Sequence, residues 1–303
     1  MLHYYNLSSA IQVFKALSAE VRIQIMELLY QDGGRSMNDL AKILGLSNSA
    51  ISLHIGKLEE AGLVKIHTVP AKRGSMKICE PTDVTLFVEM NHAQQGSKSY
   101  NHHIGVGQYT QFHAEPTCGL ATVQHVIGEY DDPRYFAFPE RIQASLLWLS
   151  NGFVEYILPN SLKAGERLTE LSVSMELASE APGTCENYPS DLYFSINGIL
   201  LGCWISPGDF GGHRGRFNPT WWPDDKNQYG LLKKITVNSR GTFLDEGMRL
   251  SDITVDDLKI DYNSTVTLRI AAPEDTKNAG GLTLFGKDFG DYNQGIKFCM
   301  VYE

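Results

Sequence analysis

The chain has 303 residues, which is long enough for two domains that each bury a hydrophobic core. Hydrophobic residues make up 43% of it, which excludes a largely disordered chain, and no run of about eighteen apolar residues that would span a membrane is present. The net charge of −9 is unevenly divided: residues 1–80 carry nine Lys and Arg against seven Asp and Glu, and the remainder carries 17 against 28. The first part can therefore approach a polyanion that the remainder would repel.

The first predicted helix begins at Ser8 or Ser9, either of which can act as its N-cap, and runs to Leu17. Ile11 and Phe14 recur with Leu17 at helical spacing and give this helix one apolar side. We expect that side to form part of a dimer surface.

Three more helices are predicted over residues 18–30, 36–44 and 47–61. The third is closed by Gly45, and after a very short turn Ser47 caps the fourth. Two helices joined by a tight turn that contains glycine are typical of a helix-turn-helix.

The stretch VKIHTVPAKRGSMKICE alternates with period two on both sides of a turn at Pro70–Gly74, which predicts a two-stranded wing with Lys72 and Arg73 at its tip. From Leu17 to Glu80 the chain resembles the ArsR-type winged-helix family, through LSAEVRIQIMELL, DLAKILGLSNSAISLHIGKLEEAGLV and the basic wing. The resemblance implies a DNA-binding transcription regulator. Because the balance of +2 over residues 1–80 is only weakly basic, we expect a homodimer that doubles the contacts with DNA.

The chain departs from that family where many of its members bind a metal. The predicted third helix begins RSMNDLA, without a cysteine, and the residues after the wing, PTDVTLFVEM, have strand spacing rather than helix spacing. No metal site is predicted from the resemblance, and the regulatory signal is expected to enter elsewhere.

The recognition helix is expected to present its first, solvent-facing residues to base edges, while cations at its end and in the wing contact phosphates. The predicted DNA-binding residues are Ser47, Asn48, Ser49, Ser52, His54, Lys57, Lys72, Arg73 and Lys77. The alternative is a winged helix used for contacts with another protein.

Residues 1–82 are predicted to form the DNA-binding domain, 83–108 a connecting strand and linker, and 109–303 a second domain. Many short strand patterns with long connections follow residue 109, and two Asn-Gly pairs, Asn151-Gly152 and Asn197-Gly198, predict tight hairpins. The expected fold class is α+β with two domains: an N-terminal winged helix-turn-helix and a C-terminal antiparallel β-sandwich of jelly-roll type. The second region resembles the galactose-binding-type sandwiches that serve as sensors behind ArsR-like heads, a resemblance that implies no particular ligand.

The most unusual stretch is the aromatic and polar segment CWISPGDFGGHRGRFNPTWWPDDKNQYG. Aromatic faces cover the C–H side of a sugar ring, and planar polar groups make paired hydrogen bonds to its hydroxyls, so we expect a sugar site. The predicted ligand-binding residues are Trp148, Glu155, Asn187, Asp191, Trp204, Asp209, Arg214, Arg216, Trp221, Trp222 and Asn227. The alternative is that the tryptophans close the end of the sandwich as a small second core, with Arg and Asp paired for structural reasons.

Other chemistry is less well supported. A transition-metal site could use His92, His102, His103, His113 and Cys118, but their spacing matches no closed site and adjacent histidines of a strand point to opposite faces. The five cysteines are scattered and never form C-x-x-C, which favours reduced thiols and a cytoplasmic protein, and no signal peptide is expected. No cofactor or catalytic residue is predicted.

We interpret the sequence as a homodimeric, ligand-responsive regulator that binds double-stranded DNA and a small polar ligand, preferably a sugar, and that is not an enzyme. Two alternatives remain open: the sandwich is a module for protein or polysaccharide contacts, or it is a carbohydrate-active enzyme that uses carboxylates such as Asp209.

Overall fold

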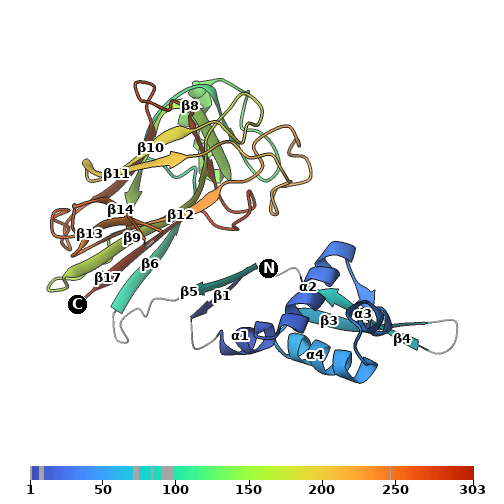
Figure 1. Ribbon diagram of the computed structural model, residues 1–303. Helices are drawn as coiled ribbons and strands as arrows, with labels where there is room; N and C mark the ends of the chain where they lie inside the picture. Colours follow the sequence, from blue (N-terminus) through green and yellow to red (C-terminus); the bar gives the residue numbers. More distant parts are fainter. Residues whose placement is uncertain (1, 7–9, 71–74, 83–84, 90–97, 246) are drawn as a thin grey trace. The chain divides into compact units, whose positions relative to one another are not determined.

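The computed structural model describes residues 2–6, 10–70, 75–82, 85–89, 98–245 and 247–303. It divides into two compact units, Met1–Gln95 and Gly96–Glu303, and each encloses its own hydrophobic core (Figure 1). Helices form most of the first unit and antiparallel strands most of the second, so the predicted α+β class is confirmed. Within these residues no helix has the length and apolar character that crossing a membrane requires.

The four predicted helices are present, as α1 (Ile11–Leu17), α2 (Glu20–Asp32), α3 (Met37–Leu44) and α4 (Asn48–Glu60). Glycines in the left-handed conformation end α2 and α3, at φ 74° for Gly33 and φ 66° for Gly45. The Ser47 hydroxyl caps α4 by accepting a hydrogen bond from the Ala50 N–H at 3.2 Å. The predicted caps of α1, Ser8 and Ser9, lie outside the described residues, and the residue before α1 is Ala10.

The wing is also present. Strands β3 (Val64–Pro70) and β4 (Ser75–Pro81) form an antiparallel pair, and the two-residue β2 (Arg35–Ser36) adds to β4. The core between this sheet and the helices contains the fully buried residues Ile25, Leu29, Leu40, Ile51, Ile55, Leu58 and Cys79. The tip of the wing, residues 71–74, lies outside the described part of the chain.

A second, small sheet of the first unit was not predicted in full. The strand pattern after the wing forms β5 (Thr85–Glu89), and it pairs in parallel with β1 (Leu2–Asn6) at the start of the chain. Pairing between residues about eighty positions apart leaves no local signal, and β1 is therefore invisible to periodicity alone.

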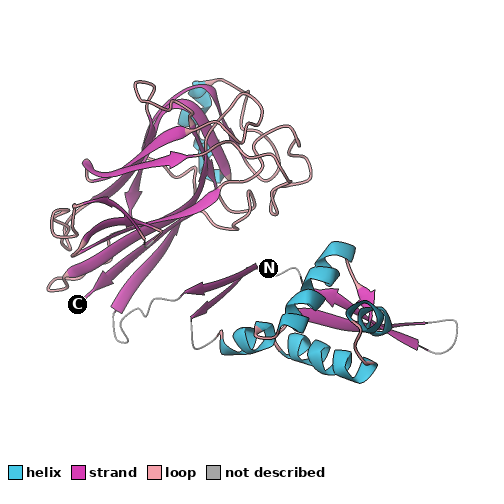
Figure 2. Cartoon of the chain, viewed as in Figure 1, coloured by secondary structure: helices cyan, strands magenta, loops and turns pink. Residues whose placement is uncertain are grey.

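The second unit is built almost wholly of strands and loops (Figure 2). Its main sheet follows the order β11-β10-β15-β8-β16-β9-β12-β13-β14, with β6 paired to β17, β17 to β9, and β7 to β8. The elements are β6 (Lys98–Ile104), β7 (Gln111–Ala121), the 3₁₀ turns η1 (Pro133–Ala137) and η2 (Pro139–Gln143), β8 (Leu146–Leu158), β9 (Leu168–Ala178), β10 (Ser190–Ile196), β11 (Ile199–Ser206), β12 (Leu231–Asn238), β13 (Gly241–Leu244), β14 (Met248–Ser251), β15 (Val266–Ala272), β16 (Leu282–Phe285) and β17 (Ile296–Tyr302). Strand β6 lies within the predicted connecting segment 83–108 but pairs with β17 in this sheet.

One of the two predicted hairpins is wrong. Asn197 and Gly198 both have positive φ, 50° and 76°, and join β10 to β11 as a two-residue turn requires. Asn151 and Gly152 instead lie inside the continuous strand β8, paired with Glu115 and Ala114 of β7. A side chain at Gly152 would lie 2.0 Å from a carbonyl oxygen of β7, so this glycine serves close strand packing and not a turn.

The second unit contains two hydrophobic clusters. The main cluster fills the sandwich between the strands. A smaller one collects Ala121, Leu146, Trp148, Ala178, Trp222, Phe285 and Phe289 beneath the loop that joins β11 to β12, residues 207–230. This smaller cluster is the second core considered as an alternative in the sequence analysis, and it brings the long loop onto the sandwich.

Candidate functional site

Helix α4 presents a polar, exposed face opposite its core face. Ile51, Ile55 and Leu58 are fully buried, whereas Asn48, Ser49, Ser52 and Lys57 are exposed. The Lys57 ammonium forms an ion pair with Glu60 at 2.8 Å. The helix therefore offers hydrogen-bonding groups to an incoming surface in its first two turns.

The other residues predicted to contact DNA are placed less uniformly. Ser47 is exposed, but its hydroxyl is engaged as the cap of α4, and Lys77 is exposed on β4. His54 is half-buried, and its Nδ1 atom is enclosed without a hydrogen-bond partner among the described residues. Lys72 and Arg73 lie outside the described residues.

The second unit contains a cavity of about 250 Å³ beside the smaller core. It is lined by Thr117, Tyr130, Asp131, Trp148, Glu180, Ala181, Pro182, Gly183, Trp222, Lys226 and Asn227. The rings of Tyr130 and Trp148 lie 5.9 Å apart, and those of Trp148 and Trp222 lie 5.8 Å apart. The Lys226 ammonium lies 5.6 Å from the centre of the Tyr130 ring, so an aromatic wall and a cation face the same space.

Glu180, two residues beyond the end of β9, contributes its carboxyl group to the lining of this cavity. Its Oε2 accepts hydrogen bonds from the Asn227 amide at 3.0 Å and from the Thr283 hydroxyl at 2.9 Å, and its Oε1 accepts one from the Thr117 hydroxyl at 3.2 Å. Burial, with the nearby Asp209 carboxyl, raises the pKa of Glu180 well above its usual range. A raised pKa favours the protonated carboxyl, which can both donate and accept a hydrogen bond.

Asp209 lies close enough to Glu180 to raise the pKa of that carboxyl, but Asp209 does not line the cavity. Its Oδ2 accepts the Ala181 N–H at 3.1 Å, and its Oδ1 is buried without a partner among the described atoms. Burial raises the pKa of Asp209 to about 7. Glu180 and Asp209 are therefore two buried carboxyl groups close together, and Asp209 accepts a hydrogen bond from one backbone N–H.

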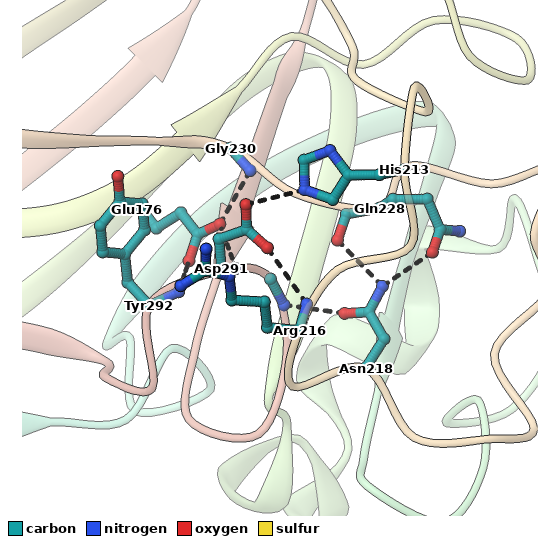
Figure 3. Close-up of polar contacts among 9 residues, drawn as sticks. Glu176, His213, Arg216, Asn218, Gln228, Gly230, Asp291 and Tyr292 are labelled. Atoms are coloured by element: carbon teal, nitrogen blue, oxygen red, sulfur yellow. Dashed lines mark hydrogen bonds and ion pairs between the residues drawn. The ribbon is translucent and has the colours of Figure 1, made fainter. Parts of the chain in front are cut away.

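A separate polar network holds the 207–230 loop in place (Figure 3). The buried Glu176 of β9 accepts backbone N–H groups of Gly230, Asp291 and Tyr292 at 2.8–2.9 Å, while burial raises its pKa to about 8. Asp291 in turn accepts the Arg216 N–H at 3.1 Å and pairs with His213 at 3.0 Å. The network holds the loop at His213, Arg216 and Gly230, on both sides of Trp222, Lys226 and Asn227.

Of the predicted ligand-binding residues, the structure brings Trp148, Trp222 and Asn227 together at the cavity. Two of the others, Arg214 and Trp221, make contacts that hold the 207–230 loop. Arg214 donates to the carbonyl oxygens of Pro219 and Trp222 and pairs with Asp224, and Trp221 donates to Val123 at 2.6 Å.

The remaining predicted residues are spread over the sandwich. Glu155 pairs with Arg269 at 2.8 Å, and Asp191 accepts hydrogen bonds from Thr276 and Asn278. Trp204 belongs to the main core, below the Lys233 ammonium, and Asn187 is exposed. None of these four lines the cavity.

The histidines considered as metal ligands do not gather where the structure describes them. His102 bonds to Ser161 at 3.0 Å, His113 pairs with Glu115 at 3.1 Å, and His92 lies outside the described residues. Within the described part of the chain, no group of three or more His, Cys, Asp or Glu side chains is arranged to hold a metal ion. Cys118 is buried, and burial raises the pKa of its thiol to about 12, which favours the unreactive thiol form.

Sequence reasoning missed Glu180, Thr117, Tyr130, Asp131 and Lys226, which lie on four separate stretches of the chain. Lys226 lies next to predicted Asn227, and Glu180 is an acidic residue at the end of an apolar strand. Neither signal is specific, because the cavity forms only where the 207–230 loop folds over the ends of β7 and β9.

Comparison with known proteins supports the assignment of the first unit. Residues 19–65 match a protein family described as winged helix-turn-helix DNA-binding. The matched range covers α2, α3 and α4 and the start of β3, and so includes the whole helix-turn-helix. Residues 19–65 therefore form a winged helix-turn-helix DNA-binding domain.

Two solved structures are similar to parts of this chain. HlyU from Vibrio cholerae N16961 is 28% identical over 24% of this chain and 76% of its own, with a TM-score of 0.21. The CBM36-1 domain of a multidomain xylanase from the hindgut metagenome of Trinervitermes trinervoides is 7% identical over 66% of this chain and 96% of its own, with a TM-score of 0.29. A search of curated proteins returned no match.

Proposed function

We propose that this chain, whose residues 19–65 form a winged helix-turn-helix DNA-binding domain, is an ArsR-like transcription regulator that responds to a small polar ligand, a sugar, in its galactose-binding-type sandwich. The observation that carries the proposal is the presence in one chain of an exposed polar recognition helix and a cavity lined by aromatic rings and hydrogen-bonding groups. The protein acts as a homodimer in the cytoplasm, and the sandwich binds its ligand without transforming it.

The chemistry of the cavity supports a sugar. Tyr130 offers a partly exposed ring against which the C–H face of a pyranose can pack. Lys226 donates hydrogen bonds, and the Glu180 Oε1 atom, with one partner, retains room to accept one. A donor and an acceptor on one side of an aromatic ring suit adjacent hydroxyls, and 250 Å³ is a volume for one or two sugar rings rather than a long chain.

Regulation requires that the ligand bind the DNA-competent and DNA-incompetent arrangements with different affinity. Ligand and operator then change each other's affinity by the same factor, typically about 5- to 150-fold. The proposal therefore predicts a measurable change in DNA affinity at saturating ligand.

The proposal is tested by a thermal-shift screen of the full chain against mono- and disaccharides and sugar acids. A ligand at about one hundred times its Kd stabilises the folded state by roughly 2.7 kcal/mol. Tyr130→Ala and Lys226→Ala should abolish the shift, while Tyr262→Ala, which removes an equally exposed ring away from the cavity, should retain it. DNA affinity is then measured by fluorescence anisotropy with and without the ligand found.

A screen without any sugar hit would contradict the sugar assignment and favour a protein or polysaccharide partner for the sandwich. A hit that leaves DNA affinity unchanged would contradict regulation by that ligand. Conversion of a bound glycoside to products would favour the enzyme alternative.

A further inference from the structure

The most exposed large hydrophobic side chain in the described part of the chain is Leu53, in the middle of α4, at 67%. Ile51, Ile55 and Leu58 define the buried face of this helix, and helical spacing places Leu53 on the opposite side. An apolar side chain in that position gains nothing from the fold of its own unit. It is exposed at the centre of the surface that a helix-turn-helix directs at DNA.

Gly56, one turn after Leu53, points to the same surface. A methyl group added at Gly56 would meet no atom within 4 Å, so the folded chain has room for alanine there. A glycine inside a helix is less favourable than alanine by about 0.5–1 kcal/mol. A half-buried glycine that the fold does not require, beside the exposed residues of this helix, fits the close approach of another molecule.

The residues of α4 indicate which chemical groups on that molecule the helix would contact. The helix contains no arginine, and its one lysine, Lys57, pairs with Glu60 at 2.8 Å. Bidentate contacts to guanine come most often from Arg or Lys, whereas Asn suits adenine and an apolar side chain suits the 5-methyl group of thymine. Asn48 and Leu53 are both exposed, and together they suit A·T base pairs.

We infer that Leu53 reads thymine in each half-site by packing against its 5-methyl group in the major groove, and that Gly56 lets the helix lie close enough for this contact. The inference rests on the proposed DNA-binding function and makes Leu53 a specificity-determining residue of it. Removal of one methyl contact should weaken binding about 3- to 5-fold, from the transfer free energy of a buried methyl or methylene group.

The test begins with selection of binding sites by the full chain from a random duplex library. Each thymine of the selected site is then replaced by uracil, which removes the methyl group and leaves the hydrogen-bonding groups unchanged. Affinity is measured by anisotropy at one fixed salt concentration, because phosphate contacts depend strongly on salt. The wild type should lose about 3- to 5-fold at one or more positions per half-site.

Leu53→Ala should bind thymine and uracil duplexes equally at those positions, while Leu200→Ala, the same change at an exposed leucine of β11, should discriminate like the wild type. Gly56→Ala should raise the melting temperature and lower affinity for the selected duplex. The inference is overturned if uracil has no effect on the wild type, or if Leu53→Ala keeps the full effect. Selected sites that lack thymine would also overturn it while leaving DNA binding intact, and failure to bind any duplex would overturn the proposed function with it.

Discussion

Glu180 and Asp209 are acidic residues in an interior that would ordinarily exclude charge. Glu180 has three side-chain donors around it, whereas Asp209 has one backbone donor and a buried oxygen, Oδ1, without a partner among the described atoms. Burial raises the pKa of Asp209 to about 7, and burial together with the nearby Asp209 carboxyl raises the pKa of Glu180 well above its usual range. The folded state is therefore more stable when these two carboxyl groups are protonated than when they are ionised.

The pH dependence of stability follows from this difference. Asp209 has a folded pKa of about 7 against a model value of 3.8, so the folded state binds more protons between these values and its stability falls as the pH rises through that interval. The slope that one such group contributes is roughly 1.4 kcal/mol per pH unit at most. Asp209→Asn cannot ionise, so its unfolding free energy should fall less steeply from pH 4 to pH 7 than that of the wild type.

Urea unfolding at a series of pH values measures this slope. Asp252→Asn, which removes a carboxylate with a 91% exposed side chain, is the matched control. Parallel curves for Asp209→Asn and wild type would show that Asp209 does not carry the effect.

At the scale of elements, the 207–230 loop places Trp222, Lys226 and Asn227 along the cavity. It has little regular structure, and side chains satisfy part of its backbone beside backbone hydrogen bonds such as that from the Gln228 N–H to the Phe210 carbonyl oxygen. Asn218 bonds to Gln228 and to Gly290, and Arg214 holds the carbonyl oxygens of Pro219 and Trp222. The aromatic residues of the loop therefore pack in the smaller hydrophobic core and also line the cavity.

Arg214→Ala should loosen the part of the loop that carries the tryptophans. The two carbonyl oxygens would lose a charged donor, at a cost of about 1–3 kcal/mol, which lowers the melting temperature of the second unit by a few degrees. The affinity for the cavity ligand should fall as well. Arg134→Ala, which removes an arginine 83% exposed and paired with Asp132, should change neither quantity by much.

Calorimetry and ligand titration of the two variants separate these effects. Equal melting temperatures for Arg214→Ala and Arg134→Ala would mean that the backbone contacts of Arg214 do not support the loop.

At the scale of the whole molecule, charge is divided between the two units. Residues 1–95 contain nine Lys and Arg and nine Asp and Glu, whereas residues 96–303 contain 17 and 26. A first unit without net positive charge has few cations with which to bind phosphates, so two copies on one operator would double the contacts. Exposed Ile11 and Phe14 on α1, and an apolar groove lined by Leu17, Ile23, Met26 and Tyr30, offer a surface for such pairing.

We therefore expect a homodimer that dissociates in the double variant Phe14→Ser/Ile23→Ser, since both side chains are more than 40% exposed and their replacement should not disturb the core. Sedimentation equilibrium should give twice the chain mass for the wild type and for Leu200→Ser, and the chain mass for the double variant. The wild type should bind two half-sites about one helical turn apart much more tightly than one, and the double variant should not. A monomeric wild type, or a double variant that remains dimeric, would rule out this surface.

The sequence by itself determined the helix-turn-helix, the wing strands and most strands of the sandwich, because each depends on local periodicity, caps and turns. Asn197-Gly198 forms a hairpin for that reason, with both φ angles positive. Tertiary structure decided the rest. Asn151-Gly152 lies within β8 because β7 packs against it, and Glu180 meets Thr283 across 103 positions of sequence. Whether Trp204 or Asp191 faced a ligand or supported the fold depended on neighbours distant in the chain, and only folding brings those neighbours into contact.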